Sequence, residues 1–364
     1  MTKWVYAFGG GKADGDGTMT ALLGGKGAGL AEMSALGISV PPGFTITTQA
    51  CDAFQQTNDF PEDLAAEVDA ALATLEQTVG ATLGDPENPL IVSVRSGAPN
   101  SMPGMMDTIL NLGLNDACAE GLAQQTGDGR FAFDCYRRFI TQYSELAMGA
   151  DLELFDDAVA KLRGGSGLSG SEFSEAELRS LATAFQAVVT DELATDFPQD
   201  PRSQLWGAIR AVVDSWGHGR AARYRAMHDI GDTPGTAVTV QAMVFGNRGT
   251  GSATGVGFTR DPSTGANRPF GEFLANAQGE DIVSGVSTPH GLSAGQGNSE
   301  SLEDTMPEVF AALIDSFGIL ERHLRWVQEV EFTVEQGRLW VLQTRNAVPS
   351  LRAAAQIAVD MVRV

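Results

Sequence analysis

Cysteine and basic residues are scarce in this sequence, and each shortage excludes a class of protein. The three cysteines in 364 residues are odd in number and widely spaced, so neither a disulfide framework nor a cysteine-based zinc site is indicated. Lysine and arginine total 24 against 46 aspartates and glutamates, a formal net charge of −22. Such a chain repels nucleic acid and anionic membranes unless its basic groups are concentrated locally. We therefore expect neither partner, and we expect any bound anion to be held by a few placed cations and backbone N–H groups.

Long apolar runs are missing as well. No stretch of about 18 consecutive apolar residues occurs, as a membrane-spanning helix would require. The N-terminal segment MTKWVYAFGGGKADGDG has no apolar core long enough for a signal peptide. The expected location is therefore cytoplasmic. The length predicts two or three domains, and a hydrophobic content of 43% with 19% charged residues is typical of a globular protein.

Familiar signatures of nucleotide and metal binding are absent or out of place. The phosphate-binding pattern GxxxxGK[ST] does not occur. One GxGxxG pattern occurs at residues 165–170, but it follows a helix-like segment rather than a strand, which favours a flexible loop between helices. The histidines show no spacing typical of a metal site; they are His218, His228, His290 and His323.

Glycine, by contrast, is abundant. The 43 glycines are clustered, which indicates several loops where the backbone approaches a ligand closely. Residues 1–114 alternate short strands with helices, among them the buried strand LIVSVR that delivers Arg95 and a helix, KGAGLAEMSALG, ended by Gly37. Residues 62–80 fit an amphipathic helix, with an apolar face formed by Leu64, Val68, Leu72, Leu75 and Val79.

The middle of the chain has a different pattern from its two ends. Residues 115–198 follow a helical period and are interpreted as a helical insertion. A further long helix is expected over residues 203–227, with a break or end at Gly217 and Gly219. Strands return from Gly235 and include TAVTVQAMVF, GSATGVGFTRD and a final pair, VQEVEFTVE and RLWVLQTR. The last helix, SLRAAAQIAVDMVRV, has no evident partner or C-cap, so we expect the natural chain to continue beyond it.

Two glycine-rich segments are candidate phosphate sites. In GGKGAGLAEM a glycine turn opens a helix with Lys26 at its start, and helix N-termini bind anions through free N–H groups and a positive dipole end. A tight turn with a surface lysine is an equally good interpretation. Residues 246–265 hold six glycines with interleaved serine and threonine. Backbone nests for phosphate oxygens and an ordinary hairpin with a mobile tip both fit that composition.

The final hairpin carries four polar residues of interest. Strand alternation places Glu329 and Glu331 on one face of its first strand. In the second strand, alternation places Gln343 and Arg345 on the face of two apolar residues, Leu339 and Val341. If the polar faces coincide, two carboxylates suited to Mg²⁺ lie beside an arginine suited to phosphate. A half-solvated hairpin with a salt bridge across it is about as good an interpretation.

A few further residues leave alternatives open. Glu272 and Glu280 lie near glycines and are either metal-facing or solvated. Of the neighbouring pair Arg137 and Arg138, one could reach a phosphate, or both could be surface charge. The stretch SVRSGAPNSMPGMMDT, residues 93–108, is too rich in proline and glycine for a helix and too apolar for an ordinary solvated loop.

Taken together and in this order, these segments resemble the N-terminal nucleotide-binding domain of pyruvate, phosphate dikinase. The resemblance covers about residues 3 to 346 and rests on GGKGAGLAEM, SVRSGAPNSMPGMMDTILNLG, YRRF, GTAVTVQAMVFG, TGVGFTRDPSTG, NAQGEDIVSGVSTP and EFTVEQGRLWVLQTR. The segment SMPGMMDT distinguishes this family from phosphoenolpyruvate synthases and other ATP-grasp phosphotransferases.

The resemblance implies an α/β (α+β) fold of the ATP-grasp type, in which two subdomains clamp ATP and a helical subdomain is inserted in the first. The implied boundaries are residues 1–114 with 199–240 for the first subdomain, 115–198 for the insertion and 241–346 for the second. Residues 347–364 would begin a linker helix to a phosphohistidine domain. That domain, and the pyruvate-binding barrel of the complete enzyme, lie outside this sequence.

The resemblance also implies the chemistry. The complete enzyme converts ATP, phosphate and pyruvate to AMP, pyrophosphate and phosphoenolpyruvate. The N-terminal domain hosts the first half, in which the β,γ-pyrophosphoryl group of Mg²⁺-bound ATP passes to a histidine of another domain and then, in part, to phosphate. The sequence alone leaves two alternatives, a stand-alone nucleotide-binding module without catalysis and a phosphotransferase related to phosphoenolpyruvate synthase.

The implied roles of residues follow from the matched segments. Lys26, Arg95 and Arg345 would neutralise the phosphates during catalysis, with a contribution from Arg138. Glu329 and Glu331 would hold Mg²⁺. The adenine would contact a hinge at Gln241, Met243 and Val244, and the remaining expected ATP-binding residues are Thr254 and Gly255 in a loop that closes over the phosphates, Glu280 at the edge of the site, and Gln343 beside the metal.

Two departures from the family pattern bear on these expectations. The family usually has aspartate where Glu329 stands, so one extra methylene changes the geometry of that metal ligand. The basic run that the family carries after its Thr-Arg pair is replaced by NAVPS, residues 346–350. That replacement leaves the start of the linker uncertain.

Overall fold

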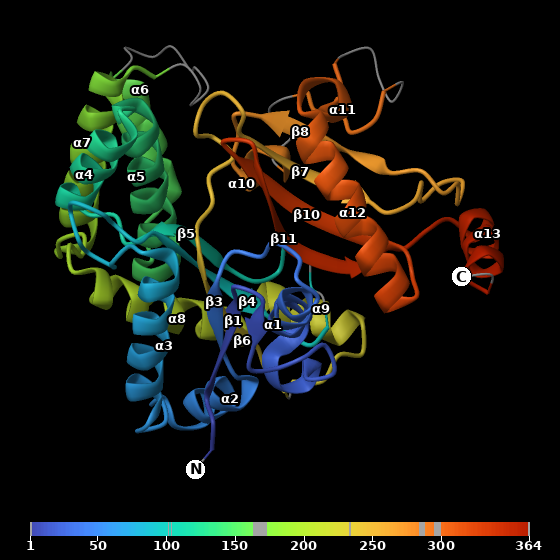
Figure 1. The fold of residues 1–364 in the computed structure, drawn as a ribbon. Helices are drawn as coiled ribbons and strands as arrows, with labels where there is room; N and C mark the ends of the chain where they lie inside the picture. The colour runs from blue at the N-terminus through green and yellow to red at the C-terminus, as the bar shows by residue number, and fades with distance from the viewer. Residues whose placement is uncertain are drawn as a thin grey trace. The chain divides into compact units, whose positions relative to one another are not determined.

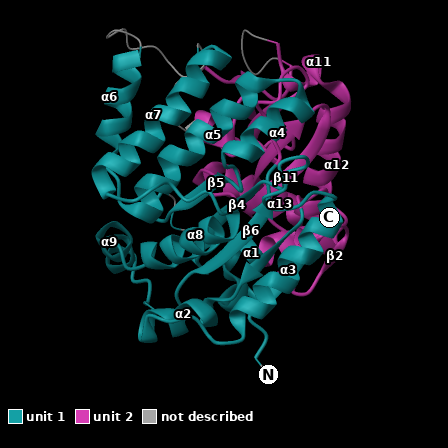
Figure 2. Ribbon diagram, turned by 90° about the vertical axis from the view of Figure 1, so that its left-hand side faces the viewer, with its two compact units in different colours: residues 1–7, 19–27, 42–243 teal, residues 8–18, 28–41, 244–364 magenta. Residues whose placement is uncertain are grey.

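The structure is a computed structural model that describes residues 2–100, 102, 104–162, 173–232, 234–283, 288–294 and 300–362. Backbone contacts divide the chain into two compact units that alternate along the sequence (Figure 2). The first unit comprises residues 1–7, 19–27 and 42–243, and the second comprises residues 8–18, 28–41 and 244–364. The subdomain boundaries expected from the sequence stay predictions. The GxGxxG segment at residues 165–170 lies outside the described residues.

The first unit is built on a sheet with the strand order β1-β3-β6-β4-β5. The pairs β3–β6, β6–β4 and β4–β5 are antiparallel. The strand bounds are Val5–Gly9 for β1, whose last two residues belong to the second unit, Gly43–Ile46 for β3, Val92–Gly97 for β4, Thr108–Leu112 for β5 and Ala237–Ala242 for β6.

The two faces of this sheet differ in polarity. Directly opposed residues of neighbouring strands share a face, so Val94, Val240 and Phe44 lie on one side, and all three are fully buried. Helices that contact these strands are α2 (Thr48–Thr57), α3 (Leu64–Val79) and α8 (Pro201–Ser215). The opposite face is polar and carries Ser93, Arg95, Thr239, Gln241 and Thr45.

The helices expected over residues 115–198 are present in the first unit. These elements, green in Figure 1, are α4 (Asp116–Thr126), α5 (Gly129–Tyr143), the π-helical turn η1 (Ser144–Met148), α6 (Leu152–Leu162) and α7 (Glu175–Leu193). Aromatic rings hold α5 to the chain that follows α7, since Phe139 and Tyr143 pack edge-on against Phe197 at 5.7 and 5.8 Å between ring centroids. The predicted break near Gly217 is confirmed, because α8 ends at Ser215 and α9 spans Gly219–Met227.

Helix α1 (Thr20–Ala35) begins earlier than expected and is kinked inside the glycine-rich segment. Gly24 has a left-handed φ of 67° at the kink. A Cβ atom at Gly24 would lie 1.7 Å from the carbonyl oxygen of Gly97, at the end of β4. Only glycine allows this approach, so the kink brings the two glycine-containing motifs of the sequence together.

The second unit is built on a sheet with the strand order β11-β10-β7-β8-β9, in which the paired strands are antiparallel. A short β2 pairs with the end of β1 in the same unit. The strand bounds are Lys12–Ala13 for β2, Ala253–Phe258 for β7, Phe270–Ala275 for β8, His290–Gly291 for β9, Gln328–Glu335 for β10 and Arg338–Asn346 for β11. The helices are α10 (Gly279–Val283), α11 (Leu302–Thr305), α12 (Pro307–Leu324) and α13 (Leu351–Met361).

One face of the second sheet is the core of its unit. Val330, Phe332 and Val334 of β10 are fully buried there with Phe317 and Leu313 of α12, and α12 lies across β10 in Figure 1. Two glycines of β7 make room for this packing. A Cβ atom at Gly255 would lie 2.2 Å from the Phe332 ring, and one at Gly257 would lie 2.6 Å from the Phe317 ring.

A β-bulge in the final hairpin corrects the expected faces of β11. Phe332 pairs with Val341, but Glu331 pairs with Gln343, so Leu342 is an extra residue without a partner on β10. A bulge of this kind reverses the alternation of the strand beyond it. Gln343 and Arg345 therefore lie on the face of Glu331 and Glu329, not on the face of Val341 as strict alternation predicted.

The secondary structure expected from the sequence is otherwise largely confirmed, and so is the mixed α/β class. One apolar position of the predicted helix over residues 62–80 differs, because Val79 is exposed. Across the described part of the chain, none of the helices combines the length and the apolar character needed to cross a bilayer.

We predict that Gly24→Ala destabilises the protein strongly. An alanine in the left-handed conformation costs about 1–2 kcal/mol of folding free energy. The clash of its Cβ atom with the Gly97 carbonyl should raise the total loss to about 3 kcal/mol or more. Gly37→Ala is the matched control, because Gly37 also has a positive φ of 77° but no atom within 4 Å of its Cβ position. Urea denaturation of both variants measures the difference, and equal losses would refute the close packing at Gly24.

Candidate functional site

Lys26 is held directly against the end of β4. Its Nζ donates a hydrogen bond of 2.7 Å to the carbonyl oxygen of Ser96. The neighbouring Gly25 N–H donates to the carbonyl oxygen of Ala98 at 2.9 Å. Lys26 follows the kink of α1 and is therefore at the start of the straight part of that helix, as the sequence indicated. The side chain is half-buried, so its cationic head is positioned rather than freely mobile.

Arg95 lies on the polar face of the same sheet. Its guanidinium donates to Gln241 Oε1 at 3.3 Å, and Gln241 is 1% exposed. The hydroxyls of Thr45 and Thr239 are 3.4 Å apart on that face, and a Cβ atom at Gly27 would lie 2.7 Å from Thr45 Oγ1. The first unit thus gathers Lys26, Arg95 and Gln241 around one polar sheet face that α1 contacts through a glycine.

The expected hinge lies where the chain passes from one unit to the other. Gln241 is inside β6, whereas Met243 and Val244 follow the end of this strand. The Met243 N–H still donates to the carbonyl oxygen of Ile91 at 2.9 Å. The last residue of the first unit is Met243, and Val244 begins the second. A contact with adenine at these residues stays a prediction.

Arg138 is bound to a buried carboxylate on its own helix. Asp134 is 7% exposed and accepts from Arg138 Nε at 2.9 Å and from Arg137 at 2.7 Å. Burial alone raises the pKa of Asp134, but the charges and hydrogen bonds of the two arginines outweigh burial, so the net effect lowers the pKa. The sequence left open which arginine faces the site, and the structure shows both held by one carboxylate.

The polar face of the second sheet carries the four hairpin residues together. Glu329 pairs with Arg345 across β10 and β11, and Glu331 pairs with Gln343. The Arg345 guanidinium donates to Glu329 Oε1, an ion pair that raises the pKa of Arg345. All four side chains are half-buried. The bulge at Leu342 is what brings the two pairs onto one face.

The two carboxylates and one amide on this face suit Mg²⁺, which takes part of its coordination shell from substrate and water. They suit less well a metal ion that is coordinated by protein ligands alone. Glu329 and Glu331 offer hard carboxylate oxygens, and Gln343 adds an amide oxygen. Within the described ranges, no group of three or more His, Cys, Asp or Glu residues is placed to hold a metal ion. Mg²⁺ commonly takes one or two carboxylates and completes its shell with substrate phosphates and water, and the residues present fit that pattern.

Thr254 and Gly255 do not lie in a loop, and that expectation is wrong. Both are buried inside β7, which pairs with β10 on one side and β8 on the other. Gly255 serves the core face, whereas Thr254 lies on the polar face and donates to the Phe332 carbonyl oxygen at 3.4 Å. Glu280 is half-buried in α10, whose first residue, Gly279, lies close to Thr254 Oγ1. A role for these residues in ATP binding stays a prediction.

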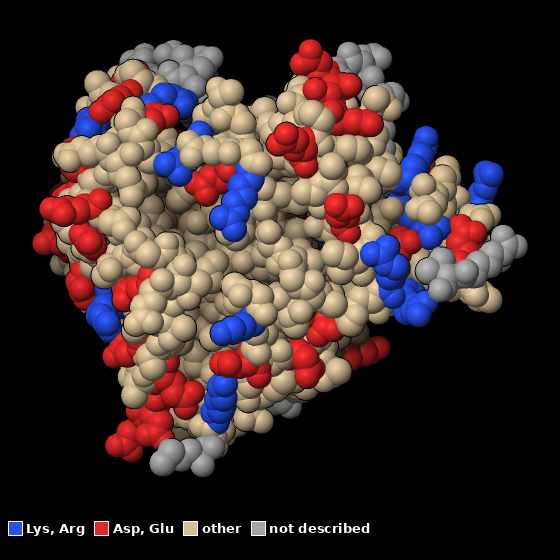
Figure 3. Space-filling view, in the orientation of Figure 1, with Lys and Arg blue, Asp and Glu red and all other residues tan. Residues whose placement is uncertain are grey.

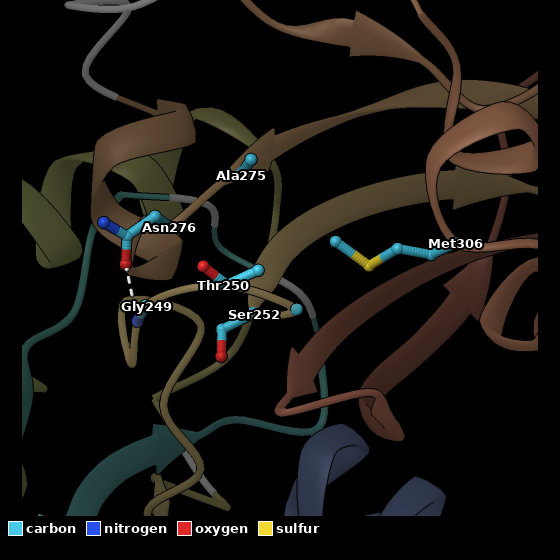
Figure 4. Close-up of a pocket in the computed structure, with 7 residues that line it drawn as sticks. Gly249, Thr250, Ser252, Ala275, Asn276 and Met306 are labelled. Atoms are coloured by element: carbon cyan, nitrogen blue, oxygen red, sulfur yellow. Dashed lines mark hydrogen bonds between the residues drawn. The ribbon is translucent and has the colours of Figure 1, made fainter.

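The part of the glycine-rich segment before β7 forms a turn with a small pocket (Figure 4). The pocket has a volume of about 360 Å³, and Asn276 closes one side by accepting the Gly249 N–H at 2.9 Å. None of its lining residues is charged, so the pocket by itself does not neutralise a phosphate. The lining residues are Gly249, Thr250, Gly251, Ser252, Ala275, Asn276 and Met306.

Sequence reasoning missed two buried carboxylates of the first unit. Asp134 was hidden among the apolar residues of its helix. Asp107, in the diagnostic segment SMPGMMDT, is 6% exposed and lies 3.7 Å from His218 Nδ1 and 3.6 Å from the Arg220 guanidinium. Burial raises the pKa of Asp107, and the nearby His218 and Arg220 partly offset this. A single acidic residue in an otherwise apolar segment was the sequence feature that could have indicated this buried carboxylate.

The distribution of charge on the surface agrees with the composition. On the face shown in Figure 3, acidic side chains are spread widely, and the described Lys and Arg side chains are single or in small groups. The cations at the candidate site are therefore local exceptions on an acidic protein, as the net charge of −22 requires.

Comparison with known proteins identifies a family match. A family model described as the pyruvate phosphate dikinase AMP/ATP-binding domain matches residues 20–62 and 56–316. This match confirms the resemblance inferred from the motifs, and the mixed α/β fold agrees with the ATP-grasp type that the resemblance implied.

Curated relatives match the chain over nearly its whole length. Pyruvate, phosphate dikinase of Rhizobium meliloti is 48% identical over 368 residues, which cover 99% of this chain and 41% of that protein. Pyruvate, phosphate dikinase 2 of Oryza sativa is 47% identical, covering 98% of this chain and 40% of that protein. The enzyme of Clostridium symbiosum is 46% identical, covering 100% and 40%. The chain thus spans about two fifths of the length of these relatives.

We predict that Asp134→Asn costs about 2–4 kcal/mol at pH 7, because it removes one partner of a buried ion-pair cluster. The folded-state pKa of Asp134 lies below the unfolded value of about 3.9, so its contribution is complete above that value and is lost as the pH falls through the folded-state pKa. The variant should therefore lose less stability than the wild type between pH 5 and pH 2, as measured by urea denaturation.

The control for this prediction is Asp69→Asn. Asp69 pairs with Arg202 on the surface, and both side chains are more than half exposed, so the control should lose at most about 0.5 kcal/mol. Equal losses in the two variants at pH 7 would refute the role assigned to Asp134.

Proposed function

Since the chain belongs to the pyruvate phosphate dikinase AMP/ATP-binding domain family, we propose that it binds Mg²⁺ and ATP and passes the β,γ-pyrophosphoryl group to a histidine of another domain, which keeps one phosphoryl group and gives the other to phosphate. The observation that carries this proposal is the composition of the two polar sheet faces. One holds Lys26 and Arg95, and the other pairs Arg345 with two carboxylates. Triphosphate and divalent metal are the ligands that this combination suits.

The cations act by positioning and charge neutralisation. Phosphoryl transfer has little need for covalent help from the protein, and its transition state places charge on the phosphate oxygens. Lys26, fixed by the Ser96 carbonyl oxygen, and Arg95, fixed by Gln241, present charge from rigid backbone. Arg345 supplies a planar guanidinium that grips two oxygens at once. Arg138 adds charge from α5, where Asp134 sets its orientation.

The metal would be held by Glu329 and Glu331, with Gln343 beside them. When bound, Mg²⁺ would supply neutralisation of the phosphate charge. The neighbouring arginine has a further task. Arg345 forms an ion pair with Glu329, which holds this carboxylate on the same face as Glu331. Aspartate at position 329, as is usual in the family, would shorten this ligand by one methylene.

The adenosine part is proposed to lie along the hinge and the adjoining strand. Gln241, Met243 and Val244 lie where the chain leaves the first unit, and Thr254 and Glu280 offer polar side chains in the second. Gly255 contributes close packing behind Thr254 rather than a ligand contact of its own. The proposed partners are ATP, phosphate, a phosphohistidine domain and a pyruvate-binding barrel.

We predict that Lys26→Ala and Arg345→Ala each weaken the binding of ATP in the presence of Mg²⁺ by about tenfold to hundredfold, the size of a lost charged hydrogen bond. Isothermal titration calorimetry on the 364-residue chain measures the dissociation constants. Arg202→Ala, which removes an exposed arginine paired with Asp69, should leave binding within twofold of the wild type. Unchanged ATP binding in both site variants would refute the proposed ATP site.

The transfer step is tested by adding a separately produced phosphohistidine domain of a relative. We expect AMP to form from ATP and phosphate only when both proteins and Mg²⁺ are present, and to form more slowly with Glu331→Gln. Chromatographic separation of AMP from ADP measures the reaction. Formation of ADP instead of AMP, or of AMP without the second domain, would contradict the proposed transfer of a pyrophosphoryl group.

A further inference from the structure

The most exposed apolar side chains of the second unit lie at α13, whose bounds are Leu351–Met361. Among the described residues, four large apolar side chains of this unit are more than half exposed, and all four lie in α13 or beside it. Leu351 is 94% exposed, and Val362 is 86% exposed. The other two are Val348 and Val359. Isolated exposed apolar residues are ordinary, whereas a group of them marks an interaction surface.

One side of α13 is apolar along its whole length and exposed. Residues at steps of three and four along a helix share a side. On this side of α13 each residue is apolar and exposed, and we call it the outer face. It consists of Leu351, Ala355, Ala358, Val359 and Val362. Arg352 lies at the border of the outer face, and Gln356 and Asp360 lie beyond it, so the face itself carries no charge.

The opposite side of α13 is fixed to the second unit by buried contacts. Ala353 and Ile357 are fully buried in a small apolar cluster. Arg260, which is 2% exposed, donates to Asp360 of α13 at 2.9 Å and to Glu321 of α12 at 2.7 Å. Breaking a buried ion pair of this kind is costly, so α13 keeps one orientation on its unit.

The turn after β7 forms the other part of this attachment. Ser350, the N-cap residue of α13, donates its N–H to the Pro262 carbonyl oxygen at 2.9 Å. Its hydroxyl donates to the Ser263 carbonyl oxygen at 2.8 Å. Gly265 has a φ of 79°, and a Cβ atom there would lie 2.8 Å from a carbonyl oxygen of α13. Part of a motif that carried the family resemblance, TGVGFTRDPSTG, thus positions α13 and fixes the direction of its outer face.

A second copy of the chain is a poor occupant for this face. Stable interfaces between separate proteins take about 20–30 residues from each side, far more than the outer face of one short helix provides. Two chains that each carry a net charge of −22 also repel each other. The face therefore suits a contact that is made within one polypeptide.

A segment of the same polypeptide can cover the outer face with much less contact. Tethering raises the effective concentration of a neighbouring segment to about the millimolar range, so a few apolar contacts are enough to hold it. The relatives have such polypeptide, because this chain spans only 41% and 40% of the length of two of them. The resemblance is to their N-terminal domain, so the unmatched part of each relative follows the matched part.

We propose that the outer face of α13 is covered by an apolar segment of the polypeptide that follows it, of the kind that the relatives carry after the matched region. This inference rests on the proposed function only where further domains are attached to this chain, and it does not depend on ATP binding. The attachment through Arg260 and Gly265 holds the face in place for that segment.

The experiment measures how fast a cysteine on the outer face reacts with a maleimide. The three native cysteines are buried, so they give a low background. Ala355→Cys places a thiol on the outer face, and Gln356→Cys, the matched control, places one about 100° around the helix. Both variants are made in the 364-residue chain and in a longer protein, in which the unmatched part of the Rhizobium meliloti relative is joined after Val364.

We expect the longer protein to slow labelling of Ala355→Cys by about tenfold or more, the effect of about 1.4 kcal/mol for closing the contact. Labelling of Gln356→Cys should change less. Adding Leu351→Asp should restore the rate at Ala355→Cys in the longer protein, because covering a carboxylate with apolar groups is unfavourable, while aspartate suits the first turn of a helix. Equal rates at Ala355→Cys in the shorter and longer proteins would overturn the inference.

A second measurement decides the outcome if the joined protein misfolds, which reaction of the native cysteines would reveal. The unmatched part of the relative, produced separately and added at up to about 1 mM, should slow labelling of Ala355→Cys in the 364-residue chain but not of Gln356→Cys. No slowing there would overturn the inference.

Sedimentation of the 364-residue chain should show a monomer. A dimer that Leu351→Asp dissociates would overturn the inference in favour of a second copy. Failure of the wild type to bind ATP would defeat the proposed ATP site and leave this inference standing, so the two failures are distinguishable.

Discussion

The contact on which the arrangement of the first unit depends is that of Gly24 with the Gly97 carbonyl oxygen. A left-handed residue without a side chain lets α1 turn and approach the end of β4 to within a distance that no other residue permits. Lys26 then reaches the Ser96 carbonyl oxygen, and Gly27 rests on Thr45 beside the polar face that carries Arg95. The glycines of this motif therefore have a structural task that precedes any ligand, since they set the place of the lysine.

Both units separate packing from chemistry by the alternation of strand residues. In the first sheet, Val94 and Val240 face the helices while Arg95 and Gln241 face the other way. In the second, Phe332 lies in the core while Glu331 lies opposite. The candidate site residues of these strands, among them Arg95, Gln241 and Glu331, are thus held by strands whose other face is buried, which limits their movement. Rigid placement of this kind is what charge-based catalysis requires.

Much of this arrangement could be predicted from the sequence, and the exceptions have physical causes. The helical period of residues 115–198 and the alternation in β10 were readable because local periodicity determines which face is buried. The faces of Gln343 and Arg345 were not, because the bulge at Leu342 depends on pairing with β10 and leaves no local signal. The pattern of GSATGVGFTRD predicted a strand correctly, whereas the closing loop that the family resemblance implied at Thr254 and Gly255 is wrong. Gly255 and Gly257 make room for Phe332 and Phe317, which are distant in sequence. The ion pair of Asp134 with Arg138 was not predicted, because the many apolar residues of this helix give no indication that Asp134 is buried among them.

The extra residue at Leu342 also affects how this hairpin tolerates changes in length. Before the bulge, the odd-numbered residues Leu339 and Val341 face the core. After it, the odd-numbered residues Gln343 and Arg345 face the opposite side. Loss of Leu342 would remove the bulge and still leave both sets of side chains on their present faces, whereas loss of Thr344 would turn Arg345 toward the core. The hairpin should therefore tolerate a deletion at Leu342 but not one at Thr344. What keeps the charged pair on its face is the number of residues between it and the bulge, more than the identity of those residues.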